Sequence, residues 1–247
     1  MPLVEAMTTQ RAVRRLTSEP VDDEIVLRCI ELALKAPTGS NGQNWEFVVV
    51  KDREVKARLA QRYRQAWALY HGAGEWITEK SGSGGFTGGL ASALDRVAGS
   101  SGDAESTRRI MRAVQWQVDH FEDLPVLVVA CLRGARVPLV PPPPVGASSL
   151  YGSIYPSVQN LLLAARAVGL GASLITLPLW STASARSILG LPLSVQPACV
   201  VPLGWPQGRY GPTTRRPVGD VVHVDRFGNR PWAGRRLEDP EPGSGSG

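Results

Sequence analysis

The residues best suited to chemistry lie in one short segment, residues 36–45. Pro37 ends the preceding helix because it has no N–H and disfavours helical geometry at the residue before it. Gly39 and Gly42 are expected to let the backbone turn tightly and approach a ligand without a Cβ in the way. Polar side chains fill the positions around them: Thr38, Ser40, Asn41 and Gln43. This surface suits a flat heteroaromatic ring with polar edges, although an ordinary polar loop has the same composition.

A second candidate is a group of arginines near the N-terminus, Arg11, Arg14 and Arg15. Three arginines within five positions can simply belong to a solvated turn. At the end of a helix they can also direct several cationic forks toward one phosphate, which suits a phosphomonoester dianion. The pattern alone leaves both interpretations open.

The first segment resembles a loop of the FMN-dependent nitroreductase family. That loop reads Ala-Pro-Ser-x-x-Asn-x-Gln-Pro-Trp, and here Thr38 replaces its serine and Asn44 its second proline. Both replacements are chemically mild. The resemblance implies that a flavin lies against residues 36–45.

The arginine group resembles the Arg-Ser-[Val/Ile]-Arg-x-Phe motif of the same family. In the family this motif grips the phosphate, the ribityl chain and the pyrimidine edge of FMN. The resemblance implies that Arg11 holds the phosphate end and that Arg14 faces N1 and the C2 carbonyl of the ring. Ala12 replaces the usual serine, so one hydroxyl contact should be missing.

Two later segments match the family in the same order. Gly169-Leu170-Gly171 leads into residues 173–178, and the resemblance places Thr176 and Leu177 beside N5 and the dimethylbenzene side of the ring. Residues 213–217 resemble a basic element that closes on the FMN phosphate. Arg215 is the expected contact there, with Arg216 as the alternative.

Taken together, the resemblance implies one set of cofactor-binding residues: Arg11, Ala12, Val13, Arg14, Pro37, Thr38, Gly39, Asn41, Gln43, Thr176, Leu177 and Arg215. No catalytic side chain is expected, because the cofactor carries the chemistry and the protein supplies orientation and charge. No metal site is expected either. The three histidines are too far apart in sequence to suggest a cluster: His71, His120 and His223.

The Gly169-Leu170-Gly171 segment does not make a dinucleotide-binding fingerprint. Its glycines follow an expected helix instead of a strand, and residue 174 is leucine where a glycine would be needed. A nicotinamide cofactor would therefore bind only transiently, at the flavin face, which predicts ping-pong turnover.

Apolar periodicity predicts the elements that hold these segments in place. Helices are expected over about ten residues leading into Gln10, and over residues 20–36, 52–70, 156–168 and 182–190. Strands are expected over residues 46–51, 124–132, 197–203 and 218–224. Asp22 and Asp52 are the expected helix caps. The prolines of residues 137–145 predict an extended loop.

A chain of 247 residues with 43% hydrophobic content can bury one sizeable core, and we expect a single domain over residues 1–240. Residues 71–108 contain a Gly-rich stretch over residues 81–103, which by composition is typical of a flexible linker. The resemblance implies instead a mobile lid over residues 71–108, because in the family this region forms helices over the flavin face. The Gly/Ser tail at residues 241–247 is expected to be disordered.

Charge and cysteine content narrow the class of protein. The net charge is +5, but the basic residues are scattered without interleaved aromatic residues, so phosphorylated small molecules explain the charge and nucleic acid is not expected. The cysteines, Cys29, Cys131 and Cys199, are odd in number and lie in apolar settings, which favours buried thiols in a reducing cytoplasm. Neither a secretory signal nor a membrane span is expected.

The resemblance implies an α+β nitroreductase-like fold, with a central, mainly antiparallel sheet flanked by helices. It also implies an intertwined homodimer with one FMN at each end of the interface. By this analogy Arg11 to Arg14 and Arg215 come from one subunit, and residues 37–43 from the other.

The implied activity transfers two electrons from NAD(P)H through flavin N5 to an electron-poor small molecule such as a nitroaromatic, quinone or enone. Two alternatives stay open: oxygen-dependent fragmentation of FMN to dimethylbenzimidazole, and non-catalytic flavin storage or sensing. The sequence does not identify the acceptor or distinguish NADH from NADPH.

Overall fold

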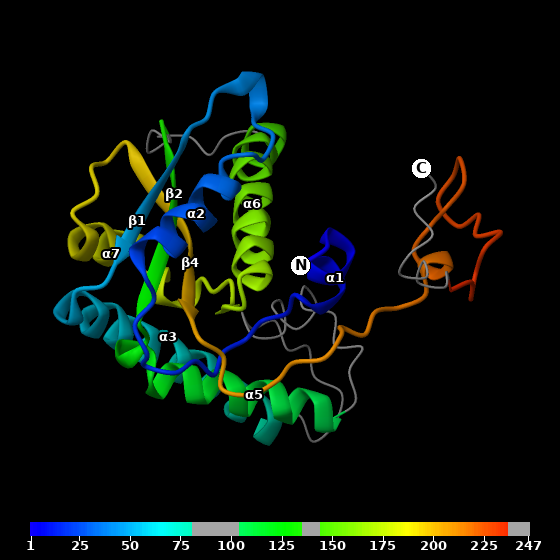
Figure 1. Ribbon diagram of the computed structural model, residues 1–247. Helices are drawn as coiled ribbons and strands as arrows, with labels where there is room; N and C mark the ends of the chain where they lie inside the picture. Colours follow the sequence, from blue (N-terminus) through cyan, green and yellow to red (C-terminus); the bar gives the residue numbers. More distant parts are fainter. Residues whose placement is uncertain (81–103, 135–143, 237–247) are drawn as a thin grey trace. The chain divides into compact units, whose positions relative to one another are not determined.

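The computed structural model of the protein describes residues 1–80, 104–134 and 144–236 (Figure 1). The chain divides into two compact units, Met1–Gly211 and Pro212–Gly247. Three predicted features fall wholly or largely outside the described residues: the Gly-rich part of the lid, most of the 137–145 loop and the tail. The single domain over residues 1–240 stays a prediction.

A four-stranded sheet forms the centre of the first unit. Its strands are β1 (Trp45–Val50), β2 (Val126–Arg133), β3 (Gly171–Ala172) and β4 (Val195–Gly204). They lie in the order β1-β2-β4-β3, and every neighbouring pair is antiparallel. The mainly antiparallel sheet and the three predicted strands of this unit are therefore confirmed.

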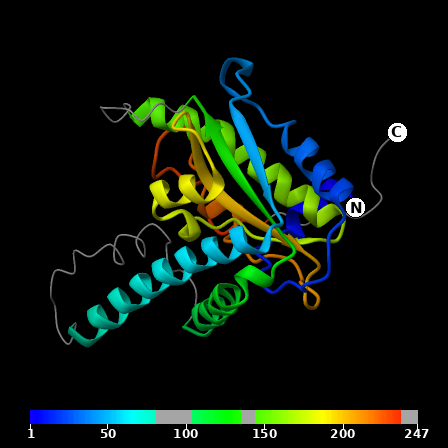
Figure 2. The same cartoon turned by 90° about the vertical axis from the view of Figure 1, so that its left-hand side faces the viewer.

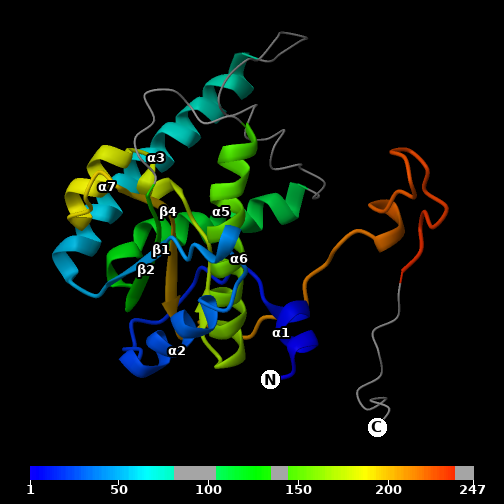
Figure 3. The same ribbon diagram turned by 90° about the horizontal axis from the view of Figure 1, so that it is seen from above.

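Helices cover both faces of this sheet, which gives three layers (Figures 2 and 3). One face packs against α2 (Asp23–Ala33) and α6 (Pro144–Ala167). The other packs against α3 (Arg53–Lys80), α5 (Ala104–Asp119) and α7 (Thr182–Leu189). Successive residues of β2 point to opposite faces, so Val128 joins the first cluster and Val129 the second. Because both faces of β2 are buried, its sequence is apolar from Val126 to Leu132, and only the terminal Arg133 is exposed.

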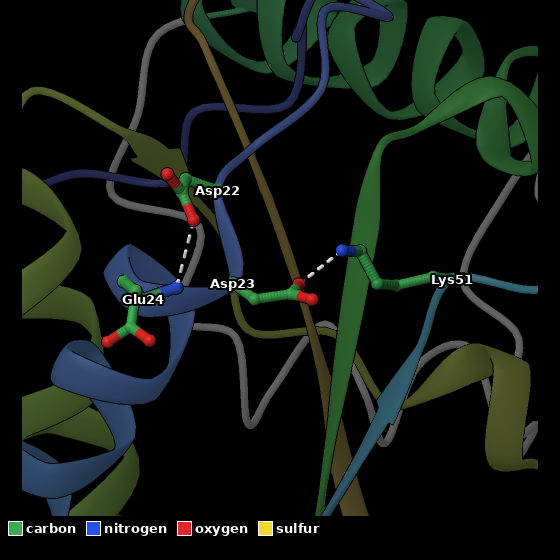
Figure 4. A network of polar contacts seen from close by, with 4 residues as sticks. All are labelled: Asp22, Asp23, Glu24 and Lys51. Carbon is green, nitrogen blue, oxygen red and sulfur yellow. Dashed lines mark hydrogen bonds and ion pairs between the residues drawn. The ribbon is translucent and has the colours of Figure 1, made fainter.

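The start of α2 shows how a predicted cap works (Figure 4). The Asp22 side chain accepts a hydrogen bond from the Glu24 backbone N–H at 3.1 Å, and Asp23 and Glu24 place negative charge at the positive end of the helix. Asp23 also pairs with Lys51, just after β1. Both partners are largely exposed, so the pair contributes little stability and mainly ties the helix end to the strand end.

The helix predicted over residues 156–168 is longer than expected. It begins at Pro144 and carries Pro156 in its interior instead of in its first turn. Proline removes the hydrogen bond to the carbonyl four residues earlier, that of Gly152. Burial of Ile154, Val158 and Leu161 on the sheet side of this helix offsets that loss, so the helix continues through the proline.

The strand predicted over residues 218–224 was wrong. In the second unit, Val218–Asp220 forms a short 3₁₀ helix, η4. Its turn is closed locally, because Asp220 Oδ1 accepts a hydrogen bond from the Gly234 N–H at 2.7 Å. A Cβ on Gly219 would lie 1.6 Å from the Trp232 carbonyl oxygen, so this segment packs against its own loop.

Within the described ranges, no helix combines the length and the apolar character that crossing a bilayer would require. The cysteines Cys29, Cys131 and Cys199 are free and buried, as predicted. Burial raises the pKa of Cys29 to about 11 and that of Cys199 to about 12.

Candidate functional site

Residues 11–17, which we call the arginine segment, form a short extended stretch that is added to the edge of the sheet. It follows α1 (Leu3–Thr9), and the Val13 N–H donates a hydrogen bond to the Ala172 carbonyl of β3 at 2.9 Å. Farther along, the Thr17 N–H donates to the Trp205 carbonyl at 2.8 Å. Backbone bonds at both ends fix this segment to the core.

Gly171 makes this close approach possible. A Cβ at this position would lie 2.6 Å from Leu16 Cδ2 and 2.7 Å from Val13 Cγ1. Val13 and Leu16 are themselves buried and cannot move away without opening the core. The second glycine of the Gly169-Leu170-Gly171 segment therefore serves packing of the arginine segment, a role that the sequence did not reveal.

The arginines of the segment differ in environment. Arg11 is exposed, whereas Arg14 is half-buried and its Nε has no hydrogen-bond partner among the described residues. Burial lowers the pKa of Arg14, and the neighbouring Tyr63 acts in the opposite direction. A buried guanidinium donor without a partner carries a desolvation cost that an acceptor on a ligand would offset.

A shallow groove beside Arg11 contains a second cation that the sequence reasoning missed. Arg166 lines this groove near the C-terminal end of α6, and its Nε donates a hydrogen bond to Thr9 Oγ1 at 2.9 Å. Arg166 is the one charged residue in Pro144–Ala167, and that isolation in an apolar helix is the signal that could have identified it. Two guanidinium groups therefore border one groove.

The segment after β3 carries the next predicted residues. Ile175 exchanges two backbone hydrogen bonds with Val200 of β4, at 2.8 and 2.9 Å. Thr176 then precedes the 3₁₀ helix η3 (Leu177–Leu179), where Thr176 is exposed and Leu177 is half-buried. Because Ala172 pairs with Ala12, the structure brings residues 173–177 and the arginine segment to the same edge of the sheet.

The loop of residues 36–45 contains the 3₁₀ helix η1 (Gly39–Asn41) and is mostly exposed. The Gln43 N–H donates to Thr38 Oγ1 at 3.3 Å, and Gln43 Nε2 donates to Asn41 Oδ1 at 3.2 Å. Three of its non-glycine residues have left-handed backbone angles: Ser40, Asn41 and Gln43, with φ of 52°, 53° and 47°. Such angles are strained for residues with a Cβ.

The tight turn expected at Gly39 and Gly42 is present, because the Gly42 N–H donates to the Gly39 carbonyl at 2.9 Å, but it does not depend on a left-handed glycine angle. Gly42 has φ of −67°, which any residue can adopt. A Cβ there would lie 3.1 Å from Asn44 Nδ2 and 3.2 Å from the Gly39 carbonyl oxygen, so glycine avoids two tight contacts. The strain falls on the polar residues themselves, as often happens where a loop binds a ligand.

Within one chain, the loop and the arginine segment do not form one site. The loop meets α6 near Ser153, whose Oγ accepts from the Gly39 N–H at 3.4 Å, whereas the groove beside Arg11 meets α6 at Arg166. Thirteen helical residues separate those two points, which corresponds to roughly 20 Å. Figure 1 shows the loop and α1 at opposite ends of α6.

Arg215 belongs to the second unit. Its Nη1 donates a hydrogen bond to the neighbouring Thr214 carbonyl at 2.8 Å, and the residue is exposed. Its expected contact with the cofactor phosphate stays a prediction.

Comparison with known proteins identifies the family. The Nitroreductase family model matches residues 7–205. A protein of Methanothermobacter thermautotrophicus, provisionally named NADH dehydrogenase/NAD(P)H nitroreductase, is 23% identical over 94% of this chain and 88% of its own length. Rat iodotyrosine deiodinase 1 is 37% identical over 57 residues, which are 23% of this chain and only 20% of the rat protein.

Solved structures with the same fold include an iodotyrosine deiodinase bound to FMN and 3-iodo-L-tyrosine. It has a TM-score of 0.63 and 20% identity over 92% of this chain and all of its own. NfrA1 of B. megaterium also has a TM-score of 0.63, with 19% identity over 91% of this chain and 74% of its own. With the family match over most of the chain, these findings show that the protein belongs to the nitroreductase family.

Proposed function

We propose that the protein is an FMN-dependent oxidoreductase that takes two electrons from NAD(P)H and passes them to an electron-poor small molecule. The observation that carries this proposal is the arginine segment held against β3. This segment carries Arg14, whose buried Nε has no hydrogen-bond partner among the described residues. FMN has matching groups, since its pyrimidine edge accepts hydrogen bonds and its phosphate is a dianion.

The residues present fit this cofactor. Arg11 and Arg166 border one groove and would hold the phosphate end. The family resemblance implies Arg215 as a further phosphate contact. Arg14 would donate to the pyrimidine edge. Thr176 and Leu177 follow on the same edge of the sheet and would lie beside N5.

When bound, FMN supplies hydride acceptance and electron donation, so the protein needs no nucleophile of its own. The protein binds and orients the ring, and its arginines place positive charge where negative charge develops on reduction. NAD(P)H and the acceptor would occupy the same face in turn, which is the basis for ping-pong kinetics.

The second half of each site would come from another copy of the chain. The loop carrying Pro37, Thr38, Gly39, Asn41 and Gln43 lies too far from the arginine segment of its own chain to share one ring with it. A homodimer that brings the loop of one copy to the arginine segment of the other removes this difficulty.

Subunit complementation tests the shared site directly. One variant carries Arg11→Ala and Arg14→Leu, and the other carries Asn41→Ala and Gln43→Ala. Neither should bind FMN alone. In a mixed dimer one of the two sites contains only wild-type residues, so random exchange should restore about a quarter of all sites. Confirmed subunit exchange without recovery of flavin would show that each chain forms its own site.

The activity is tested by the anaerobic visible spectrum of the purified protein with FMN. Bleaching by NADPH or NADH, followed by recovery with a nitroaromatic, quinone or enone, supports the proposal. An iodinated tyrosine belongs in the acceptor panel because relatives carry the name iodotyrosine deiodinase. Loss of FMN with formation of dimethylbenzimidazole in oxygen would select flavin fragmentation. Bound flavin that no nicotinamide bleaches would select storage or sensing, and failure to bind FMN would overturn the proposal.

A further inference from the structure

Three buried polar side chains from different elements form a hydrogen-bonded network on the α3 side of the sheet. They are Tyr63 of α3, Gln117 of α5 and Ser173, the residue after β3, and each is at most 1% exposed. The Tyr63 hydroxyl donates to Gln117 Oε1 at 3.5 Å, and Gln117 Nε2 donates to Ser173 Oγ at 2.9 Å. We call these three residues the Gln117 network.

Burying such a network is costly, since polar groups removed from water must recover their hydrogen bonds inside the protein. A leucine at residue 117 would pack in the same apolar surroundings without that requirement. Gln117 is completely buried on a helix whose other buried residue in this turn is Val118. A polar side chain at such a position calls for a role besides filling the core.

One end of the Gln117 network reaches the backbone that carries the candidate site. Ser173 follows Ala172, whose carbonyl accepts the hydrogen bond from Val13 in the arginine segment. Three residues later the chain reaches Thr176, at the start of η3. Holding Ser173 therefore restrains both the arginine segment and residues 172–177, which are joined by the hydrogen bond at Ala172.

The other end of the Gln117 network, Tyr63, packs in one apolar cluster with Val13 and Leu16, the residues on either side of Arg14 and Arg15. Burial raises the pKa of Tyr63 to about 12, while the positive charge of Arg14 acts in the opposite direction. Tyr63 is therefore a neutral phenol at physiological pH and uses its one proton toward Gln117. Its ring is held edge-on against Phe121, with ring centroids 5.2 Å apart. The fixed ring therefore supports the buried side of the segment that carries Arg14, whose Nε has no partner among the described residues.

We infer that Gln117 is a positioning residue for flavin chemistry: through Tyr63 and Ser173 it holds the arginine segment and residues 172–177 in the places that favour the reduced cofactor. Gln117 itself does not touch the flavin. This inference rests on the proposed function. A guanidinium at the pyrimidine edge stabilises negative charge on reduced flavin more than it stabilises the oxidised ring, so its position sets a reduction potential. If this guanidinium is held less firmly, the affinity for reduced FMN should fall more than the affinity for oxidised FMN.

The test measures the midpoint potential of bound FMN, together with the affinity for oxidised FMN, in variants of the Gln117 network. Gln117→Leu keeps the volume and removes both hydrogen bonds, and we expect the preference for reduced over oxidised flavin to fall about tenfold. For a two-electron couple this is a potential about 30 mV more negative. Tyr63→Phe and Ser173→Ala each remove one bond and should produce shifts of the same sign.

Ser157→Ala is the matched control. Ser157 is also a fully buried serine, but it lies on α6, on the opposite side of the sheet, and its Oγ has no partner among the described residues. This variant should leave the potential unchanged. The double variant Gln117→Leu/Ser173→Ala should shift the potential by less than the sum of the single shifts, because both substitutions break the same bond.

The outcomes separate the two proposals. If the wild-type protein does not bind FMN, the proposed function fails and the inference fails with it. If the wild-type protein binds FMN but Gln117→Leu and Tyr63→Phe keep its potential, the proposed function stands and the Gln117 network is only structural. Should Gln117→Leu fail to fold, the milder Tyr63→Phe and Ser173→Ala variants decide the question alone.

Discussion

The arginine segment and the loop of residues 36–45 are held by the molecule in opposite ways. The arginine segment is joined to the sheet by backbone hydrogen bonds of 2.8 and 2.9 Å, with Val13 and Leu16 buried beneath it. The loop is exposed, is fixed to α6 by a bond of 3.4 Å, and contains three non-glycine residues with left-handed angles. The first region is a platform that the protein's own backbone bonds and buried side chains hold in place. The second stores strain that contact with a ligand or another subunit could offset.

The largest expected effect comes from removing the platform. In Gly171→Val the new side chain would enter the space of Leu16 and Val13, which are already buried. Overpacking at such a site costs about 1–3 kcal/mol, and two close contacts favour the upper end. Urea unfolding should show the loss, and FMN titration should show no binding. Gly152→Ala is the control, because a Cβ there meets no atom within 4 Å. If Gly171→Val keeps wild-type stability and flavin binding, close packing against Gly171 is not what holds the arginine segment in place.

Removing one of the expected phosphate contacts should affect FMN binding and not the fold. Arg11→Ala and Arg215→Ala should each weaken FMN binding by roughly 1.5–3 kcal/mol, as expected for a lost hydrogen bond to a charged group. Both residues are exposed, so thermal unfolding without cofactor should hardly change. Arg28→Ala on α2 removes an exposed arginine that pairs with Glu31, and it controls for net charge. Full flavin occupancy in both variants would contradict the phosphate assignment.

Alkaline pH should reduce the stability of the protein through ionisation of Tyr63, which packs beneath the arginine segment. The pKa of Tyr63 is about 12 in the folded protein and its ordinary value is 10.0, so the unfolded chain loses this proton first as the pH rises. The stability that Tyr63 contributes is complete below pH 10 and is lost as the pH approaches 12, by about 2 kcal/mol.

The comparison with Tyr63→Phe isolates that contribution. The buried thiols also ionise at alkaline pH, but they are present in both proteins and their contribution cancels. Urea unfolding between pH 9 and 12 should therefore show a steeper loss in the wild-type protein than in Tyr63→Phe. Parallel pH profiles would mean that Tyr63 ionises equally easily in both states.

The sequence predicted the layers of the fold well because their signals are local. Asp22 as a cap and the apolar run of β2 each reflect the chemistry of a few neighbouring residues. The strand expected at residues 218–224 failed because closure by Asp220 and Gly234 overrides a weak alternation. For the site, the resemblance supplied the segments, and Arg166 left one local signal as the single charged residue of α6. Gln117 becomes visible only when α5 and β3 are placed together. Such long-range pairings leave no periodic signal in a single sequence.

The smallest effect tests whether the strain in the loop is real. Ser40 has φ of 52°, where glycine is favoured over residues with a Cβ, so Ser40→Gly should stabilise the free protein by about 1 kcal/mol. Ser40→Ala keeps the Cβ and should give no such gain, which makes it the matched control. Unfolding of both variants without cofactor measures the difference.

Flavin titration of the same two variants then separates strain from contact. Ser40 is not among the residues expected to touch FMN, so its replacement changes the backbone more than the binding surface. If Ser40→Gly stabilises the free protein but binds FMN more weakly than Ser40→Ala, the strained angles hold the loop in its binding shape. If Ser40→Gly stabilises the protein and binds FMN as well as Ser40→Ala does, the strained angles do not contribute to binding. The polar side chains of the loop would then account for its contribution to the site.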